Sequence, residues 1–291
     1  MASFILSAFA DEASPTLSGQ IAALRRNHIS YLEPRSIEGD VASKSDEELT
    51  AIRRTLDKAG IRVFSLGSPI GKDKIENDFA PHFEKFLRAL RACEILGASR
   101  MRMFSFFVEQ DSLTRYRDEV MIRLSRMLDE AEKHGIILCH ENEAAIYGQN
   151  PDEVRDLLTT LPRLHGIFDA ANYLMQGPDA VSGLSETLRR LEYVHVKDAR
   201  KAERVVTAAG EGDADYPAVI KKLDESTDET IVLTVEPHLH IFDAFREIDR
   251  HEFRSYRSFD TSDEAFDYAV AAIKRVLTDC GYHEEGYLWK K

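Results

Sequence analysis

The sequence predicts an α/β fold, a (β/α)8 barrel (TIM barrel), forming a single domain over residues 1–291. Eight short runs of strand-like residues recur along the chain, and segments with one apolar helical face lie between them. Strands that alternate with helices pair in parallel, and eight such units in a chain of this length fit one barrel. The strand-like runs are 3–9, 29–34, 61–67, 99–106, 135–141, 164–170, 191–198 and 230–237.

An open, doubly wound sheet is the alternative architecture. It is weaker because the first strand is followed by SAFADEAS, which lacks the GxGxxG pattern of a phosphate-binding turn. The two long connections at 199–215 and 238–260 are predicted to be irregular. They follow the last two strands, at the end where a barrel keeps its active site.

Capping residues mark several helix ends. Ser14 and Pro15 predict a cap and first position for a helix that runs to about Arg26. A second helix has a capping box at Ser45 and Glu48 and ends at Gly60, and Thr261 with Glu264 caps the last helix.

Composition and charge narrow the function classes. The chain is 43% hydrophobic and 31% charged, with no apolar run near the roughly 20 residues of a membrane helix. It begins without a basic leader, so we expect a cytoplasmic protein with no membrane partner. The formal net charge of −13 argues against a nucleic-acid partner. The cysteines Cys93, Cys139 and Cys280 are widely spaced and are predicted to be reduced thiols.

Four successive strands end in potential metal ligands. Glu141 ends the fifth strand, Asp169 the sixth, His195 lies on the seventh, and Glu236 on the eighth. Taken alone, each acid could cap a helix and the histidine could be a hydrogen-bonded core residue. In a barrel, however, these strand ends converge, and three carboxylates gathered at one point require a counter-charge. Three oxygen ligands and one imidazole suit Mn²⁺, Mg²⁺ or Co²⁺, and tolerate Zn²⁺.

Six short motifs give the chain a family resemblance. It resembles the xylose isomerase-like TIM-barrel superfamily, in particular the bacterial sugar phosphate isomerase/epimerase proteins. The matching motifs are GSPIGK at 67–72, HENEAAIYG at 140–148, FDAANY at 168–173, VHVKDA at 194–199, AGEGD at 209–213 and VEPHL at 235–239. The resemblance implies one divalent metal ion, Mn²⁺ first, held by Glu141, Asp169, His195 and Glu236. It also implies that Glu141 and Glu236 form the acid/base pair.

The implied activity is that of a divalent-metal-dependent isomerase or epimerase of a ketose or related sugar. One glutamate removes a proton beside the carbonyl, the metal stabilises the cis-enediolate, and the other glutamate returns a proton. The alternative is a metal-dependent lyase that dehydrates a keto-sugar, a keto-inositol or a dehydroshikimate-like acid. An apurinic endonuclease and a non-catalytic sugar-binding barrel rank lower.

Six further side chains near the strand ends are predicted to bind substrate: Glu33, Lys72, Arg102, Asn172, Lys197 and His238. Several have a plain structural alternative: Glu33 can pair with Arg35, Lys72 can be a solvated loop lysine, and Arg102 can be a buried ion-pair partner. Asn172 can orient Asp169, and Lys197 can contact a neighbouring carboxylate. The expected partner is a small sugar, phosphorylated or free. The sequence is compatible with a homo-oligomer but does not fix the oligomeric state.

Overall fold

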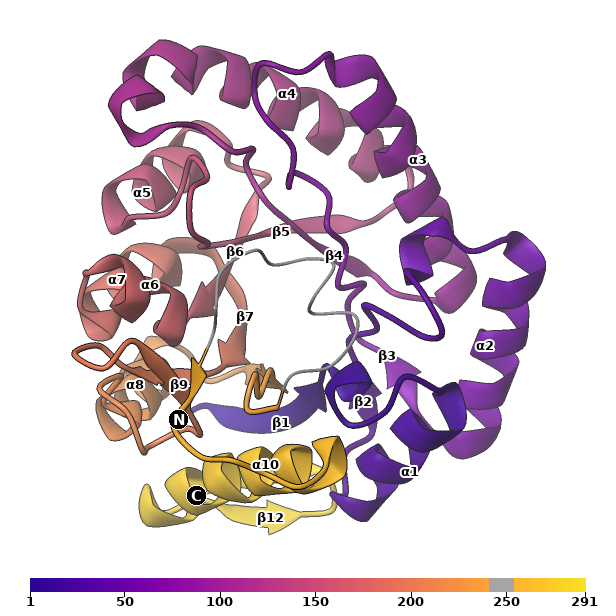
Figure 1. Ribbon diagram of the computed structural model, residues 1–291, viewed down its shortest axis with the longest axis vertical. Helices are drawn as coiled ribbons and strands as arrows, with labels where there is room; N and C mark the ends of the chain where they lie inside the picture. Colours follow the sequence, from indigo (N-terminus) through magenta and orange to yellow (C-terminus); the bar gives the residue numbers. More distant parts are fainter. Residues whose placement is uncertain (241–253) are drawn as a thin grey trace.

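The computed structural model describes residues 1–240 and 254–291, and its strands form a ring with the helices outside it (Figure 1). All eight predicted strands are present, although some are shorter than predicted. They are β1 (Ser3–Ala8), β2 (Tyr31–Leu32), β3 (Arg62–Val63), β4 (Arg100–Met103), β5 (Ile137–Glu141), β6 (His165–Asp169), β7 (Leu191–Val196) and β10 (Thr230–Val235). The predicted barrel is therefore confirmed.

Parallel pairing runs around the ring, as crossover helices require. The ladder β1–β10–β7–β6–β5–β4 is continuous, and β2 pairs with β3. Two short contacts close the remaining seams. Glu33 donates its backbone N–H to the carbonyl of Ala8 at 3.1 Å, and an isolated bridge joins Leu66 to Met101. All eight strands therefore direct their carboxyl ends to one side.

The helices lie outside the strands and bury one face each (Figure 1). The predicted cap of α2 is confirmed: Ser45 and Glu48 form a capping box, and Gly60 ends the helix at φ 74°. The predicted cap of α10 at Thr261 is also confirmed. The helices are α1 (Leu17–Arg26), α2 (Asp46–Ala59), α3 (Phe79–Leu96), α4 (Leu113–Lys133), α5 (Pro151–Thr160), α6 (Ala170–Gln176), α7 (Ala180–Thr187), α8 (Tyr216–Ser226) and α10 (Ser262–Asp279).

The first helix begins later than predicted. Thr16 is its N-cap, and its hydroxyl accepts the N–H of Gly19 at 3.2 Å. The hydroxyl of Ser14 instead accepts the N–H of Thr16 at 3.3 Å. Both residues can cap, and the structure uses the second, so the prediction of a cap at Ser14 was wrong.

The connection at 199–215 is more regular than predicted. Strands β8 (Asp198–Arg200) and β9 (Val205–Thr207) form an antiparallel pair, and β11 (Arg254–Ser255) joins β9. The buried carboxylate of Asp198 orders the turn that follows, because it accepts backbone N–H groups from Ala199, Gly210, Gly212 and Ala214. Most of the second predicted connection, residues 241–253, lies outside the described residues.

A C-terminal hairpin, which the sequence did not suggest, completes the sheet. Strands β12 (His283–Glu285) and β13 (Leu288–Lys290) pair with each other, and β13 lies antiparallel to β1 with Trp289 opposite Phe4. The hairpin therefore covers one edge of β1.

Apolar side chains form the main packing inside the ring below its carboxyl end. Phe64, Cys139, Ile167, Tyr193 and Val232 form one buried cluster there. The predicted free thiols are confirmed for all three cysteines, of which Cys93 and Cys139 are buried. Above the apolar cluster, at the carboxyl ends of the strands, the buried side chains become polar and charged.

Candidate metal centre

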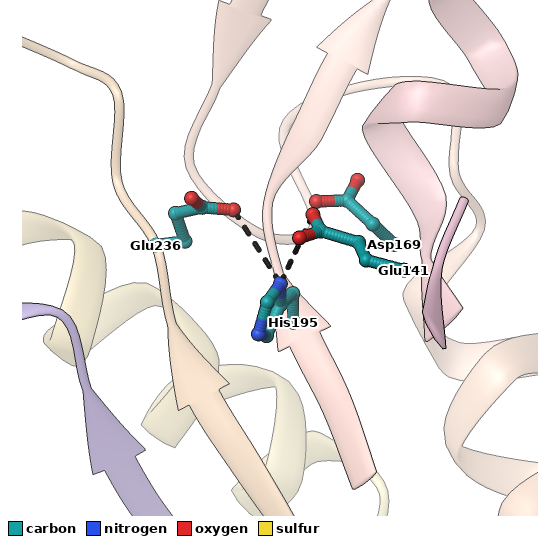
Figure 2. A group of neighbouring side chains, drawn as sticks. All are labelled: Glu141, Asp169, His195 and Glu236. Carbon is teal, nitrogen blue, oxygen red and sulfur yellow. Dashed lines mark ion pairs between the residues drawn. The ribbon is translucent and has the colours of Figure 1, made fainter. Parts of the chain in front are cut away.

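The four predicted ligands converge at the carboxyl ends of β5, β6, β7 and β10. Glu141 and Asp169 end their strands, His195 lies opposite Asp169 in the β6–β7 ladder, and Glu236 directly follows β10. One potential ligand atom from each lies within 4.8 Å of the others, and Figure 2 shows the imidazole between Glu236 and the other two acids. All four side chains are buried, with His195 and Asp169 fully so. The predicted convergence is confirmed, whereas metal binding stays a prediction.

The imidazole of His195 faces carboxylates on two sides. Its Nδ1 lies 3.1 Å from Glu141 Oε1 and 3.7 Å from Glu236 Oε2, and its Nε2 lies 3.4 Å from Glu33 Oε2. Burial disfavours the imidazolium, but Glu141 and Glu33 outweigh it and raise the pKa of His195 to about 10. Neither ring nitrogen has hydrogen-bond geometry to any described residue. A neutral ring carries a proton on one nitrogen, so a second proton or a metal ion can bind the lone pair of the other.

The pKa values of the acids separate according to their neighbours. Burial raises the pKa of Asp169 to about 7, with Lys197 opposing the shift. Burial also acts on Glu141, but His195 and Arg102 outweigh it and lower the pKa of Glu141 to about 2. The same balance, with Lys197 as the main opposing charge, holds the pKa of Glu236 well below its usual range. Both glutamates are therefore ionised at neutral pH.

Three basic side chains contact the carboxylate oxygens of these acids. Lys197 Nζ lies 3.0 Å from Asp169 Oδ2 and 3.2 Å from Glu236 Oε2. Arg102 Nη1 lies 3.2 Å from Glu141 Oε2 and 3.8 Å from Glu236 Oε1. The structure thus places Arg102 and Lys197 in contact with carboxylates, which was the alternative reading of each. Their predicted role in substrate binding stays a prediction.

Arg35 is the third basic residue, and the sequence reasoning missed its role. Its guanidinium forms two hydrogen bonds with Asp11, at 2.9 and 3.1 Å, and reaches Glu12 at 3.3 Å and Glu236 at 3.2 Å. Burial, opposed by Arg35, raises the pKa of Glu12 to about 8. A signal was available for Asp11 and Glu12 alone, since they lie three and four residues after the end of β1, at the same end of the barrel as the predicted ligands.

The amide side chains of Asn142 and Asn172 fix two of the acids. Asn142 exchanges hydrogen bonds with the backbone of Asp169, accepting its N–H at 2.9 Å and donating to its carbonyl at 3.0 Å. Asn172 donates its backbone N–H to Asp169 Oδ1 at 2.8 Å and its side-chain amide to Glu141 Oε1 at 3.3 Å. The backbone at Asn172 therefore orients Asp169, whereas the side chain of Asn172 contacts Glu141. The predicted role of Asn172 in substrate binding stays a prediction. Asn142 was not singled out.

The other predicted substrate-binding residues lie around this set. Lys72 is half-buried, 3.1 Å from Glu143 Oε2, and its ammonium lies over the ring of Phe104. His238 Nε2 lies 3.5 Å from an oxygen of both Glu12 and Glu236.

Glu33 differs from its predicted position on the rim. It is fully buried beneath His195 and accepts the hydroxyl of Tyr193 at 2.7 Å. The sequence had offered Arg35 as its alternative partner, but Arg35 forms its hydrogen bonds with Asp11, Glu12 and Glu236.

The donor set and the charge around it fit a divalent cation. Asp169 Oδ2 accepts no hydrogen bond from a described residue, although an ammonium lies nearby. Three carboxylate oxygens and one imidazole nitrogen form a mixed, hard ligand set with no thiolate. The surrounding buried cluster contains six carboxylates (Asp11, Glu12, Glu33, Glu141, Asp169, Glu236) and three basic side chains (Arg35, Arg102, Lys197). With all of these groups ionised and His195 neutral, the cluster has an excess of three negative charges, and a cation of charge +2 would offset two of them.

Family comparison identifies the barrel. A family model described as xylose isomerase-like TIM barrel matches residues 22–274. The chain belongs to this family. Within residues 1–240 and 254–291, none of its helices combines the length and apolar character needed to cross a membrane.

Individual relatives of this xylose isomerase-like chain include enzymes of two reaction types. An inosose dehydratase of Clostridium perfringens is 27% identical over 122 residues, which cover 35% of this chain and 41% of the relative. The chain thus matches less than half the length of this curated relative. A solved L-ribulose 3-epimerase has a TM-score of 0.70 at 16% identity, covering 96% of each chain. A solved IOLI protein with a bound zinc atom has a TM-score of 0.73 at 15% identity, covering 94% of this chain and 98% of that one.

Proposed function

We propose that this protein is a divalent-metal-dependent isomerase or epimerase acting on a ketose or related sugar. The observation that carries the proposal is the placement of Glu141 and Glu236 on different sides of one imidazole (Figure 2). Each turns one oxygen toward His195 Nδ1 and the other toward an arginine. Two ionised bases that face a common point can act on two positions of one substrate.

Glu141, Asp169, His195 and Glu236 would hold the metal, with Mn²⁺ the first candidate. A bound divalent ion polarises a carbonyl and supplies positive charge where an oxyanion develops. Asn142 and Asn172 keep the acids of β5 and β6 in place, which matters because small displacements at a reacting centre cost rate.

Proton transfer is the task of the two glutamates. One takes the proton from the carbon beside the substrate carbonyl, leaving an enediolate. The other, which also starts ionised, takes a proton from water and delivers it to the opposite face of the same carbon in an epimerase or to the neighbouring carbon in an isomerase. The first glutamate then releases its proton to water. Arg102 contacts both carboxylates and, after His195, is the main neighbour that lowers the pKa of Glu141.

A dehydratase is the second candidate, and the position of Lys197 favours it. Its ammonium lies beside Asp169 and Glu236 and can donate a proton. In that reaction a glutamate removes the proton beside the carbonyl, the C–O bond at the next carbon breaks, and the hydroxyl leaves as water with the proton of Lys197. The matched stretch of the inosose dehydratase supports this alternative.

Incubation with a panel of keto-sugars and keto-inositols in heavy water separates these candidates. The Mn²⁺-loaded protein is expected to put deuterium on a substrate carbon and to yield a product of unchanged composition. Loss of one water from the product would indicate the dehydratase. Absence of any exchange over the whole panel, with Mn²⁺ bound, would contradict both.

A further inference from the structure

The two ring nitrogens of His195 face different surroundings. Nδ1 points to the candidate ligand set, 3.1 Å from Glu141 Oε1. Nε2 points away from that set, and Glu33 Oε2 lies 3.4 Å from it. A neutral imidazole donates from one nitrogen and accepts at the other, so a metal on Nδ1 requires a proton on Nε2. That proton needs an acceptor, because the ring is fully buried.

Neighbouring hydroxyl groups hold Glu33 so that one of its oxygens remains to accept the Nε2 proton. The hydroxyl of Tyr193 donates to Glu33 Oε1 at 2.7 Å, and Ser65 Oγ lies 3.0 Å from the same hydroxyl. Glu33 Oε2 has no hydrogen bond from a described residue and no exposure to solvent. An unpaired carboxylate oxygen is costly in such surroundings. The atom aimed at His195 is therefore the one that lacks a donor.

The position of Glu33 argues against direct contact with a sugar. The imidazole lies between Glu33 and the four converging strand ends, with Glu33 on the Nε2 side and Glu141 on the Nδ1 side. Phe9 packs its ring edge-on against the imidazole at a centroid distance of 5.1 Å. A substrate at the ligand set would meet His195 before it met Glu33.

We infer that Glu33 is a positioning residue for the metal-binding imidazole: it accepts the Nε2 proton of His195, so that Nδ1 presents its lone pair to the metal. Tyr193 and Ser65 hold Glu33 in turn. Carboxylates placed behind ligand histidines commonly orient the ring and strengthen the ligand. The inference rests on the proposed function, since it assumes a metal at the ligand set.

The test compares Mn²⁺ affinity in Glu33→Gln, Tyr193→Phe and a matched control. Glutamine has one carbonyl oxygen in place of two carboxylate oxygens. It can therefore accept a proton from Tyr193 or from His195, but not from both. The control is Glu192→Gln, which removes a carboxylate 2.6 Å from His165 Nδ1 at the other end of β6 and β7. Each protein is stripped with chelator, and Mn²⁺ binding is measured by titration calorimetry.

We expect Glu33→Gln to weaken Mn²⁺ binding about 10–100-fold. Tyr193→Phe should weaken it about two- to fivefold, because it removes one hydrogen bond to Glu33. The control should bind like the wild type. Both variants are also assayed at saturating Mn²⁺, where the KM for the sugar reports any direct contact between Glu33 and the substrate. If Glu33→Gln does not fold, Tyr193→Phe carries the test.

Two results would overturn the inference alone. One is wild-type Mn²⁺ affinity in both variants. The other is a raised KM for the sugar with unchanged metal affinity, which would make Glu33 a substrate-binding residue. Failure of the wild type itself to bind Mn²⁺ would overturn the proposed function, and this inference with it.

Discussion

His165 and His195 lie at opposite ends of the neighbouring strands β6 and β7, and each faces a glutamate. At the amino end, His165 Nδ1 lies 2.6 Å from Glu192 Oε2, and Arg100 lies 2.5 Å from the other oxygen. The side chain of His165 is 32% exposed and that of His195 is 0% exposed. At the carboxyl end, buried carboxylates outnumber basic side chains. At the amino end, the His165–Glu192 pair is partly exposed and its charges are balanced, so we interpret it as structural. At the carboxyl end, the pairs of His195 are buried among excess carboxylates, which suits a reactive site.

The largest effect that separates the two ends is on turnover. Glu236→Gln, assayed at saturating Mn²⁺, is expected to lower kcat about 10²–10⁴-fold, because an amide cannot exchange the proton. Glu192→Gln should leave kcat unchanged. Steady-state kinetics on the substrate found by deuterium exchange gives both values. Equal activity of the two variants would remove the distinction between the two ends.

Metal content is the next test of the comparison. His195→Ala is expected to lose bound metal, since it removes the only nitrogen of the predicted ligand set. His165→Ala should retain as much metal as the wild type. Elemental analysis after reloading with Mn²⁺ and desalting measures this. Retention of metal by His195→Ala would show that the ion is held elsewhere in the protein.

Replacing one arginine at each end tests the effect of burial on stability. Arg102→Met leaves buried Glu141 with His195 alone as a counter-charge and removes one of the basic neighbours of Glu236, so it should cost about 3–5 kcal/mol. Arg100→Met breaks a partly exposed pair and should cost at most about 1 kcal/mol. Denaturant unfolding in chelator gives both values. Equal costs would mean that the carboxyl end is as well hydrated as the amino end.

The smallest expected effect is a pH dependence of stability in chelator. The folded-state pKa values of His195 and Glu12 are raised, to about 10 and about 8. A raised pKa stabilises the folded state below the unfolded pKa, and this stabilisation is lost as pH rises through the folded value. The Tm should therefore fall by a few degrees between about pH 7 and pH 10. Calorimetry of the wild type and His165→Gln should show this fall, and His195→Gln should show less of it.

The strands and the converging ligands could be predicted because both depend on local pattern. Each ligand stands where an apolar run ends, and parallel strands bring such ends together. Arg35 could not be placed in the same way. Its partners Asp11 and Glu236 lie just beyond the first and last barrel strands, and their side-chain contacts depend on how the ring closes.

Three predictions failed, each for a different local reason. Ser14 and Thr16 can both cap α1, and their hydrogen bonds decide between them. The β8–β9 pair was missed because no recognisable turn sequence marks this connection. Instead, the carboxylate of Asp198 in β8 orders the loop after β9 by accepting backbone N–H groups. Glu33 was placed on the rim because a strand-end acid gives no sign in the sequence of the depth at which it lies.

The hairpin that covers β1 has a consequence for folding kinetics. The partners of β1 in the main ladder are β10 and β13, whose residues follow it by more than 220 positions along the chain. Between β1 and the adjacent β2 the backbone hydrogen bond is that between Glu33 and Ala8, within the described residues. Pairing so remote in sequence is slow, since a long loop must close before any contact forms. During synthesis, β1 would therefore have no ladder partner until Thr230–Val235 emerges, and its second edge would stay uncovered until Trp289 emerges, so this is the stage at which a chaperone would be most needed.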